Sequence, residues 1–186
     1  KIPHSKPYID SEDVFAVAEV VNSGMHGTGK CVEIFEEQIA GFIGAKYAKA
    51  TTSGTTALHL ALLSLDIRKK DEVIIPSYVC QSLLNAVNYT GAKPVLADIS
   101  PNFEKGYNIS EDTIKPLITR KTKAIIVPHM FGVPADLEKI IKLKDEYKIP
   151  LIEDCAQSLG ASYKNKKTGS IGDIGIFSFY ATKVIS

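Results

Sequence analysis

The chain has 186 residues, 45% of them hydrophobic, and a formal net charge of +1 from 22 Lys and Arg against 21 Asp and Glu. This length and apolar content suit one domain of ordinary size with a substantial buried core. The balanced charge provides no field that would favour nucleic acid or an anionic membrane, so we expect neither as a partner. The three cysteines (Cys31, Cys80 and Cys155) are odd in number and lack CxxC spacing, which predicts reduced thiols and a cytoplasmic protein.

The sequence pattern of the first part of the chain differs from that of the rest. Helical patterns cover residues 11–22 and 32–43, and the segment between them, 23–29, is rich in glycine. We therefore separate an N-terminal helical segment, 1–45, from a larger unit, 46–186.

From about residue 46, short β-branched runs alternate with helical periods. The predicted strands are 47–51, 72–75, 93–97, 124–127, 151–153 and 174–177. The predicted helices between them are 55–65, 79–89, 110–117 and 135–147. This alternation predicts an α/β fold of three layers, α/β/α, with a mainly parallel sheet between two layers of helices.

In sheets of this kind, ligands lie beyond the carboxyl ends of the strands. The segment Ser53-Gly54-Thr55-Thr56 follows one predicted strand and opens a helix. Free N–H groups and the positive end of the helix dipole bind phosphate there, Gly54 lets an anion approach the backbone, and the hydroxyls of Thr55 and Thr56 add donors. The alternative is an ordinary helix cap, because Ser and Thr are favoured at that position in any helix.

Two further strand ends carry a carboxylate and a lysine. Asp154 ends the run 151–153, and Ser178 ends the run 174–177, with Lys183 five residues later. This pair suits pyridoxal phosphate: Lys183 would hold the cofactor as a Schiff base, and Asp154 would keep its pyridine nitrogen protonated. Alone, Asp154 would be read as a turn residue and Lys183 as a solvated surface charge.

Other residues near these strand ends have two interpretations each. Gln157 would donate a hydrogen bond to the oxygen on the pyridine ring, or lie solvated in a loop. Tyr78 would stack on a planar ring, or pack in the core. We interpret His129 as structural or supporting rather than catalytic, and Cys155 as a small buried hydrophobe.

Taken together, the motifs resemble the DegT/DnrJ/EryC1/StrS sugar aminotransferases, which have pyridoxal phosphate fold type I. The resemblance covers essentially the whole chain and is specific because many motifs occur in order. They are Pro7-Tyr8, Thr28-Gly29, Phe35-Glu36, Ser53-Gly54-Thr55-Thr56-Ala57-Leu58, Ile75-Pro76-Ser77-Tyr78, Gly91-Ala92-Lys93-Pro94-Val95, Ile152-Glu153-Asp154-Cys155-Ala156-Gln157, Gly169-Ser170-Ile171-Gly172-Asp173 and Ser178-Phe179-Tyr180-Ala181-Thr182-Lys183.

The resemblance implies a role for each candidate residue. Lys183 anchors the cofactor, Asp154 meets the pyridine nitrogen and Gln157 meets the ring oxygen. The phosphate lies against Thr55, Thr56 and Ser178 beside Gly54, and Tyr78 lies over the ring. Residues 46–186 then form the cofactor-binding large domain, and 1–45 contributes a glycine-rich loop on the substrate side. No residue is assigned to a metal.

The resemblance also implies the reaction. Such enzymes transfer an amino group from glutamate or glutamine to a keto-sugar, usually one linked to a nucleotide, and work as homodimers with sites at the subunit interface. Two alternatives remain: a pyridoxal phosphate enzyme of another type, such as a sugar dehydratase or lyase, and a non-catalytic half-subunit. Relatives that dehydrate carry His in place of the lysine, so Lys183 argues against that branch.

The chain stops at Ser186, whereas family subunits continue into a C-terminal small domain. We expect residues 1–186 to be part of a subunit that lacks this domain and to be inactive in isolation.

Overall fold

The structure is a computed structural model that describes residues 7–102 and 106–185. At its centre lies a five-stranded sheet with the order β2-β1-β3-β4-β7, in which every neighbouring pair is parallel. The parallel sheet predicted from the sequence is thus confirmed. The strands are β1 (Glu72–Pro76), β2 (Lys93–Ala97), β3 (Thr122–Pro128), β4 (Leu151–Asp154) and β7 (Ile174–Ile176).

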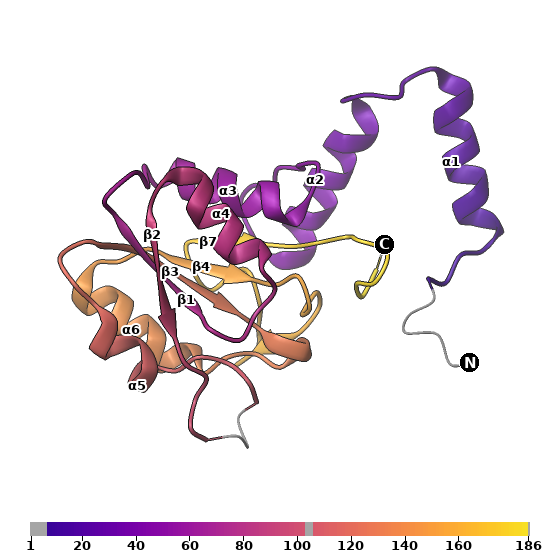
Figure 1. The fold of residues 1–186 in the computed structure, drawn as a ribbon. Coiled ribbons are helices and arrows are strands. Elements are labelled where there is room, and N and C mark those ends of the chain that lie inside the picture. The colour runs from indigo at the N-terminus through magenta and orange to yellow at the C-terminus, as the bar shows by residue number, and fades with distance from the viewer. Residues whose placement is uncertain (1–6, 103–105, 186) are drawn as a thin grey trace, which may run out of the picture.

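Helices cover both faces of the sheet, as Figure 1 shows. On one face α3 (Gly54–Ser64) and α4 (Ser82–Thr90) enclose a core that includes Leu62, Leu83 and Ile126. On the other face α5 (Glu111–Ile114) and α6 (Leu137–Tyr147) pack over a second core that includes Leu137 and Ile140. The three-layer α/β/α fold is confirmed, and burial on both faces explains why the inner strands are almost continuously apolar.

The register of the inner strands brings their carboxyl ends level with one another. Pro128 of β3 pairs with Asp154 of β4, and Asp154 pairs with Ile176 of β7. The loops that follow these strands therefore leave the sheet from one edge, which is where ligands bind in open parallel sheets.

Smaller elements complete the domain. Two short 3₁₀ turns, Lys115–Leu117 and Met130–Gly132, follow α5 and β3. A two-stranded hairpin, β5 (Ser162–Tyr163) with β6 (Lys166–Lys167), lies between β4 and β7 and was not predicted. Helix α4 begins at Ser82, later than predicted, and leaves Val79 and Cys80 in the preceding turn.

The N-terminal helices α1 (Ser11–Ser23) and α2 (Lys30–Ile43) precede the sheet. Asp10 caps α1 by accepting the N–H groups of Glu12 and Asp13, and Gly24 ends it with a left-handed φ of 71°. Figure 1 shows α1 standing apart from the sheet, and no residue of this described helix is buried. Nowhere in the described part of the chain is a helix long and apolar enough to cross a membrane.

The strand predicted at residues 47–51 is wrong. This segment has no regular structure, and within the described chain it pairs with no other strand. Instead, the N–H group of Ala50 donates to the Glu36 carboxylate of α2 at 2.9 Å. A β-branched pattern alone does not make a strand when no neighbouring strand accepts its hydrogen bonds.

Candidate cofactor-binding site

A cleft of about 1110 Å³ opens at the carboxyl edge of the sheet. It collects most of the residues that the sequence singled out, although they come from segments far apart along the chain. Those that line it are Gly54, Thr55, Asp154, Gln157, Ser178 and Lys183. Thr56 and Tyr78, the other two candidates, are not among the lining residues.

The first turn of α3 and the loop after β7 form one end of the cleft. Ser53 caps α3 by accepting the Thr56 N–H at 3.1 Å, and Gly54 is the first helical residue. A Cβ atom on Gly54 would lie 3.4 Å from Ser178 Cβ and 3.6 Å from Ser178 Oγ. The Ser178 side chain therefore lies directly beside the first residue of α3, and a hydroxyl next to a helix N-terminus suits an anion such as phosphate.

The Thr56 hydroxyl lies among the groups that cap α3. Its Oγ1 lies 2.9 Å from Ser53 Oγ and 3.3 Å from Thr52 Oγ1, so its hydroxyl takes part in the helix cap. Gly54, Thr55 and Ser178 line the end of the cleft where the phosphate is expected, which we call the phosphate end.

Asp154 lies at the end of β4 and is only 7% exposed. Its Oδ1 accepts the Ala156 N–H at 3.0 Å, and among the described residues its Oδ2 accepts no hydrogen bond. Burial raises the pKa of this carboxyl, and the Ala156 N–H and the positive charge of Lys183 oppose the rise only in part. A buried carboxylate with an uncommitted oxygen fits the protonated nitrogen of a pyridine ring.

Gln157 is oriented by a backbone contact. Its Oε1 accepts the Phe131 N–H at 3.0 Å, which assigns the other end of the amide, Nε2, as the donor that remains. Phe131 adopts a left-handed φ of 55° to make this contact. The remaining amide donor is what a ring oxygen of pyridoxal phosphate requires.

Lys183 follows Ser178 in the turn that closes this side of the cleft, where its N–H donates to Tyr180 O at 2.7 Å. The side chain is half-buried, and its charge lowers the pKa values of both Asp154 and Cys80. The amine therefore lies near both the carboxylate and the thiol.

Tyr78 lies outside the cleft, half exposed, with its ring 5.6 Å from the ring of Tyr107. Cys80, two residues later, lines the cleft instead. Hydrogen bonds with Ser82, whose hydroxyl lies 3.3 Å from the sulfur, hold the pKa of the Cys80 thiol below its ordinary value. Sequence analysis gave Cys80 no role in the site, and only its position after β1 hints at one.

Two residues of α2 reach the cleft and were also missed as site residues. Glu36 accepts the Ala50 N–H at 2.9 Å and pairs with the Lys49 ammonium at 2.6 Å, which fixes the segment that leads into Gly54. The ring of Phe35 packs edge-on against Phe179, next to Ser178, with centroids 5.0 Å apart. Helix α2 thus touches both segments of the phosphate end.

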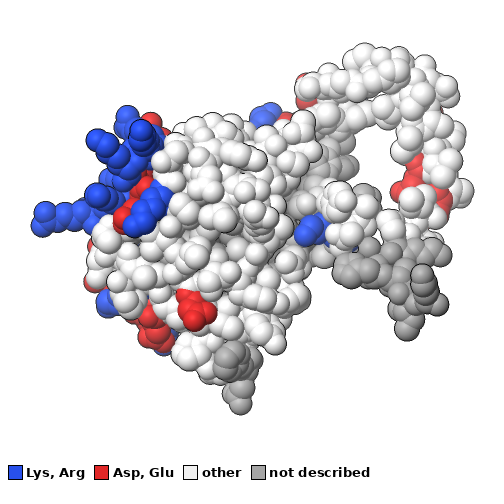
Figure 2. All heavy atoms as spheres, in the orientation of Figure 1, with Lys and Arg blue, Asp and Glu red and all other residues white. Residues whose placement is uncertain are grey.

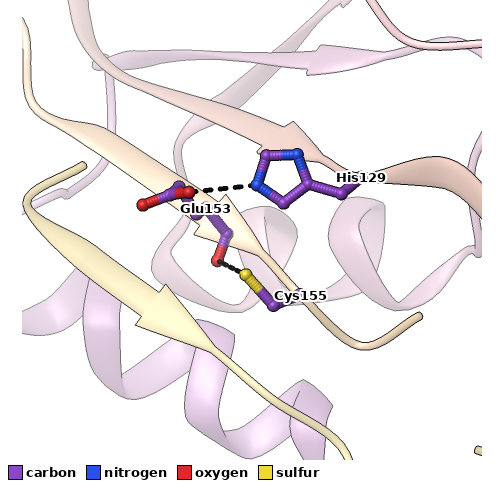
Figure 3. A group of neighbouring side chains, drawn as sticks. All are labelled: His129, Glu153 and Cys155. Carbon is purple, nitrogen blue, oxygen red and sulfur yellow. Dashed lines mark hydrogen bonds and ion pairs between the residues drawn. The ribbon is translucent and has the colours of Figure 1, made fainter. Parts of the chain in front are cut away.

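His129, Glu153 and Cys155 form a buried group beside the site, with candidate ligand atoms within 4.8 Å of one another (Figure 3). Of the three, His129 also lines the cleft. The group is unsuited to a metal because its donors are engaged. Glu153 accepts hydrogen bonds from His129 and from three backbone N–H groups, and the other ring nitrogen of His129 accepts the Ala135 N–H. Burial raises the pKa of the Cys155 thiol strongly, so it stays protonated.

Charge is spread unevenly over the surface. Figure 2 shows Lys and Arg gathered at one end of the visible face. In the sequence, cations cluster before β1, at the start of β2 and before β3, all at the amino ends of strands: Arg68, Lys69, Lys70, Lys93, Arg120 and Lys121. This surface is at the edge of the sheet opposite the cleft.

A parallel three-layer fold with a Gly-Thr-Thr helix start, a buried aspartate and a lysine at one strand edge is typical of a pyridoxal phosphate domain of the aminotransferase class. The chain belongs to the DegT/DnrJ/EryC1/StrS aminotransferase family, whose model matches residues 7–186. This family depends on pyridoxal phosphate. The predicted family and cofactor are thereby confirmed.

The relatives include enzymes named for sugar substrates. The chain is 37% identical to GDP-perosamine synthase of Caulobacter vibrioides, with 100% of this chain and 50% of that one covered. It is 41% identical to UDP-4-amino-4-deoxy-L-arabinose–oxoglutarate aminotransferase of Shewanella sediminis, with 100% and 47% covered. The chain thus spans about half the length of these curated relatives.

Solved structures agree with the fold. An aminotransferase from Psychrobacter cryohalolentis superposes with a TM-score of 0.93 at 37% identity, covering 99% of this chain and 47% of that one. A sugar aminotransferase homologue from Streptococcus pneumoniae, solved in PLP and PMP forms, gives a TM-score of 0.95 at 28% identity, with 100% and 50% covered.

Proposed function

We propose that this protein transfers an amino group from glutamate or glutamine to a keto-sugar linked to a nucleotide, with pyridoxal phosphate as cofactor. The observation that carries the proposal is the meeting of Gly54, Ser178, Asp154 and Lys183 in one cleft. The names of two relatives support the substrate class, since one is a GDP-sugar synthase and the other acts on a UDP-sugar with oxoglutarate as co-substrate.

Each residue has a distinct task in this proposal. The N–H groups at the start of α3 and the Ser178 hydroxyl bind the phosphate. The Asp154 carboxylate pairs with the ring nitrogen and keeps its proton in place, and Gln157 Nε2 donates to the ring oxygen. When bound, pyridoxal phosphate supplies the carbonyl that accepts the amino group. Its ring delocalises the electron pair that is left when the donor's α-carbon loses its proton.

Lys183 is proposed as both the covalent anchor and the base. The residue is half-buried and lines the cleft, so its amine is available to a ligand bound there. Once displaced by the amino donor, the same Nζ would be free to take the proton from the donor's α-carbon and to hold it within the site.

We further propose that the protein is a cytoplasmic homodimer. Support for the dimer comes from the apolar side chains that α1 exposes, among them Val14, Phe15 and Val17. Support for the compartment comes from Cys31, Cys80 and Cys155, which are all free thiols.

The experiment has two stages. Borohydride reduction of the cofactor-loaded protein followed by peptide mapping should place the pyridoxyl mass on Lys183. The protein is then supplied with glutamate and a nucleotide-linked keto-sugar, and the amino-sugar and 2-oxoglutarate are measured together.

Equal amounts of both products, abolished by Lys183→Ala, are expected from the full-length subunit. Loss of water from the sugar without 2-oxoglutarate would assign a dehydratase or lyase instead. Failure of the protein to take up cofactor would favour a non-catalytic role.

A further inference from the structure

Glu153 is a charged residue with no assigned role, although it lies in the middle of the molecule. It precedes Asp154 on β4, and successive residues of a strand point to opposite faces, so it faces away from the cleft. Its side chain is fully buried, and it accepts four hydrogen bonds of 2.6–3.0 Å.

The four donors come from two segments that flank β4. Oε2 accepts His129 Nε2 at 3.0 Å and the Gly169 N–H at 2.9 Å. Oε1 accepts the N–H groups of Ile171 at 2.7 Å and Gly172 at 2.6 Å. Burial raises the pKa of this carboxyl, but the His129 and backbone donors outweigh it and hold the pKa below its ordinary value, so Glu153 is ionised.

His129 connects the carboxylate to the residues after β3. Its Nδ1 accepts the Ala135 N–H at 3.1 Å, so the ring carries its proton on Nε2 and donates it to Glu153 (Figure 3). The turn that starts at His129 contains Phe131, whose N–H orients Gln157. Glu153 thereby fixes the turn that sets the Gln157 amide.

The other donors lie in the loop that enters β7. The backbone is closely packed here: a Cβ on Gly172 would lie 2.8 Å from Leu151 O, and one on Gly175 of β7 would lie 2.3 Å from Gly169 O. The same strand leads to Ser178 and then to Lys183. Glu153 thereby also fixes the entry to the strand that carries the phosphate ligand and the anchor.

We propose that Glu153 is the positioning residue of the cofactor site: its buried carboxylate joins the segments that carry Gln157, Ser178 and Lys183 to the strand that carries Asp154. His129 is its link to the first of these segments. The inference rests on the proposed cofactor site. It concerns how that site is held in shape, because Glu153 itself touches neither cofactor nor substrate.

Glu153→Gln is the direct test because it keeps the size of the side chain. An amide has one accepting oxygen and one donating NH₂, so two of the four donors would face another donor. We expect the affinity for pyridoxal phosphate to fall by about tenfold, the effect of weakening one charge-assisted contact in the site. The visible circular dichroism of the bound cofactor, which reports how the ring is held, should change as well.

Cys155→Ala is the matched control. Cys155 is buried in the same group, and its thiol donates to the Glu153 carbonyl oxygen, at 4.0 Å, rather than to the carboxylate. The Cys155→Ala variant should have a lower melting temperature without cofactor. Its affinity for pyridoxal phosphate and the visible circular dichroism of its folded fraction should be unchanged. A Glu153→Gln protein that behaves in the same way would overturn the proposal, since Glu153 would then be merely structural.

His129 supplies a second pair of variants in case Glu153→Gln does not fold. His129→Phe removes the donor, whereas His129→Gln keeps an amide donor toward Glu153. Reduced cofactor affinity in the first and recovery in the second are expected; wild-type affinity in His129→Phe would count against the proposal. If the unaltered protein binds no pyridoxal phosphate, the proposed function fails first, and the positioning role fails with it.

Discussion

At the scale of one residue, Asp154 shows how a residue suited to cofactor binding can lower the stability of the cofactor-free fold. Its carboxyl is buried and its pKa is raised, so the folded chain holds this group in the charged form only at a cost. The protonated pyridine nitrogen of a bound cofactor would offset that cost. In the cofactor-free protein the cost remains and lowers the stability of the fold.

Asp154→Asn should therefore have opposite effects on stability and on binding. Near neutral pH the cofactor-free variant should melt higher than the unaltered protein, by about 2–4 °C if the relief is about 1 kcal/mol. Its affinity for pyridoxal phosphate should fall by about 1.5–3 kcal/mol. Scanning fluorimetry of the cofactor-free proteins and absorbance titration with cofactor measure the two effects.

The pH dependence of this advantage has a definite sign. The raised pKa means that the folded protein binds the Asp154 proton more tightly than the unfolded chain, whose ordinary value is 3.8. Stability of the unaltered protein is therefore lost as the pH rises from about that value through the folded pKa. The advantage of Asp154→Asn should shrink as the pH is lowered through the same range; an advantage that grows toward acid would contradict the assignment.

At the scale of elements, the first turn of α3 combines a helix start with a binding site. Gly54→Ala should favour the helix, because alanine is the better helix former by about 1 kcal/mol. The added Cβ would be in ordinary contact with Ser178, at 3.4 Å, and would take up space at the end of the cleft where the phosphate is proposed to bind. We expect an intact or slightly more stable cofactor-free protein that binds pyridoxal phosphate more weakly, measured by the same titration.

Gly41→Ala provides the control for this substitution. Gly41 lies within α2, and a Cβ there would meet nothing within 4 Å among the described residues. Gly41→Ala should raise the stability of the folded protein through the better helix former, without a loss of affinity for pyridoxal phosphate. If the two variants bind cofactor equally well, the phosphate does not lie at Gly54.

The fold could be predicted because its signals are local. The run 93–97 matches β2 directly, and 72–75 and 151–153 each fall one residue short of the observed strand. Residues 47–51 have the same local pattern but lack a strand to pair with, and the sequence does not show which strands are neighbours. The β5–β6 hairpin was missed because its strands have two residues each, too few for a periodic signal.

The site was predicted in part for a related reason. Asp154, Ser178 and Lys183 follow predicted strands, so the parallel topology alone brings them to one edge. Glu36 and Cys80 reach the cleft through contacts that depend on packing between distant segments. Tyr78 is predicted to lie over the cofactor ring; in the structure its side chain lies 5.6 Å from the ring of Tyr107, and Cys80 lines the cleft.

At the scale of the whole molecule, α1 is the helix whose apolar side chains are left exposed. Val14, Phe15, Val17 and Val21 are each 59–65% exposed. With 100° per residue they share one broad face, and Ala16 lies on the opposite face. An apolar face of this kind on a helix that stands apart from the sheet favours association.

Phe15→Glu should therefore weaken the proposed dimer, and Ala16→Glu, which adds the same charge to the same helix, should not. Sedimentation velocity over a range of protein concentrations measures the effect. Identical sedimentation of both variants and the unaltered protein would exclude α1 from the interface.

Helix α2 gives this assembly a thermodynamic consequence. Through Phe35 and Glu36 it contacts both segments of the phosphate end, and residues 24–29 connect it to α1. If docking of α1 restrains α2, subunit association and cofactor binding are linked equilibria. Thermodynamic linkage then makes the two effects equal. Bound pyridoxal phosphate increases the affinity between the subunits by some factor, and association increases the affinity for pyridoxal phosphate by the same factor. A subunit that loses its cofactor would, to the same degree, loosen from its partner.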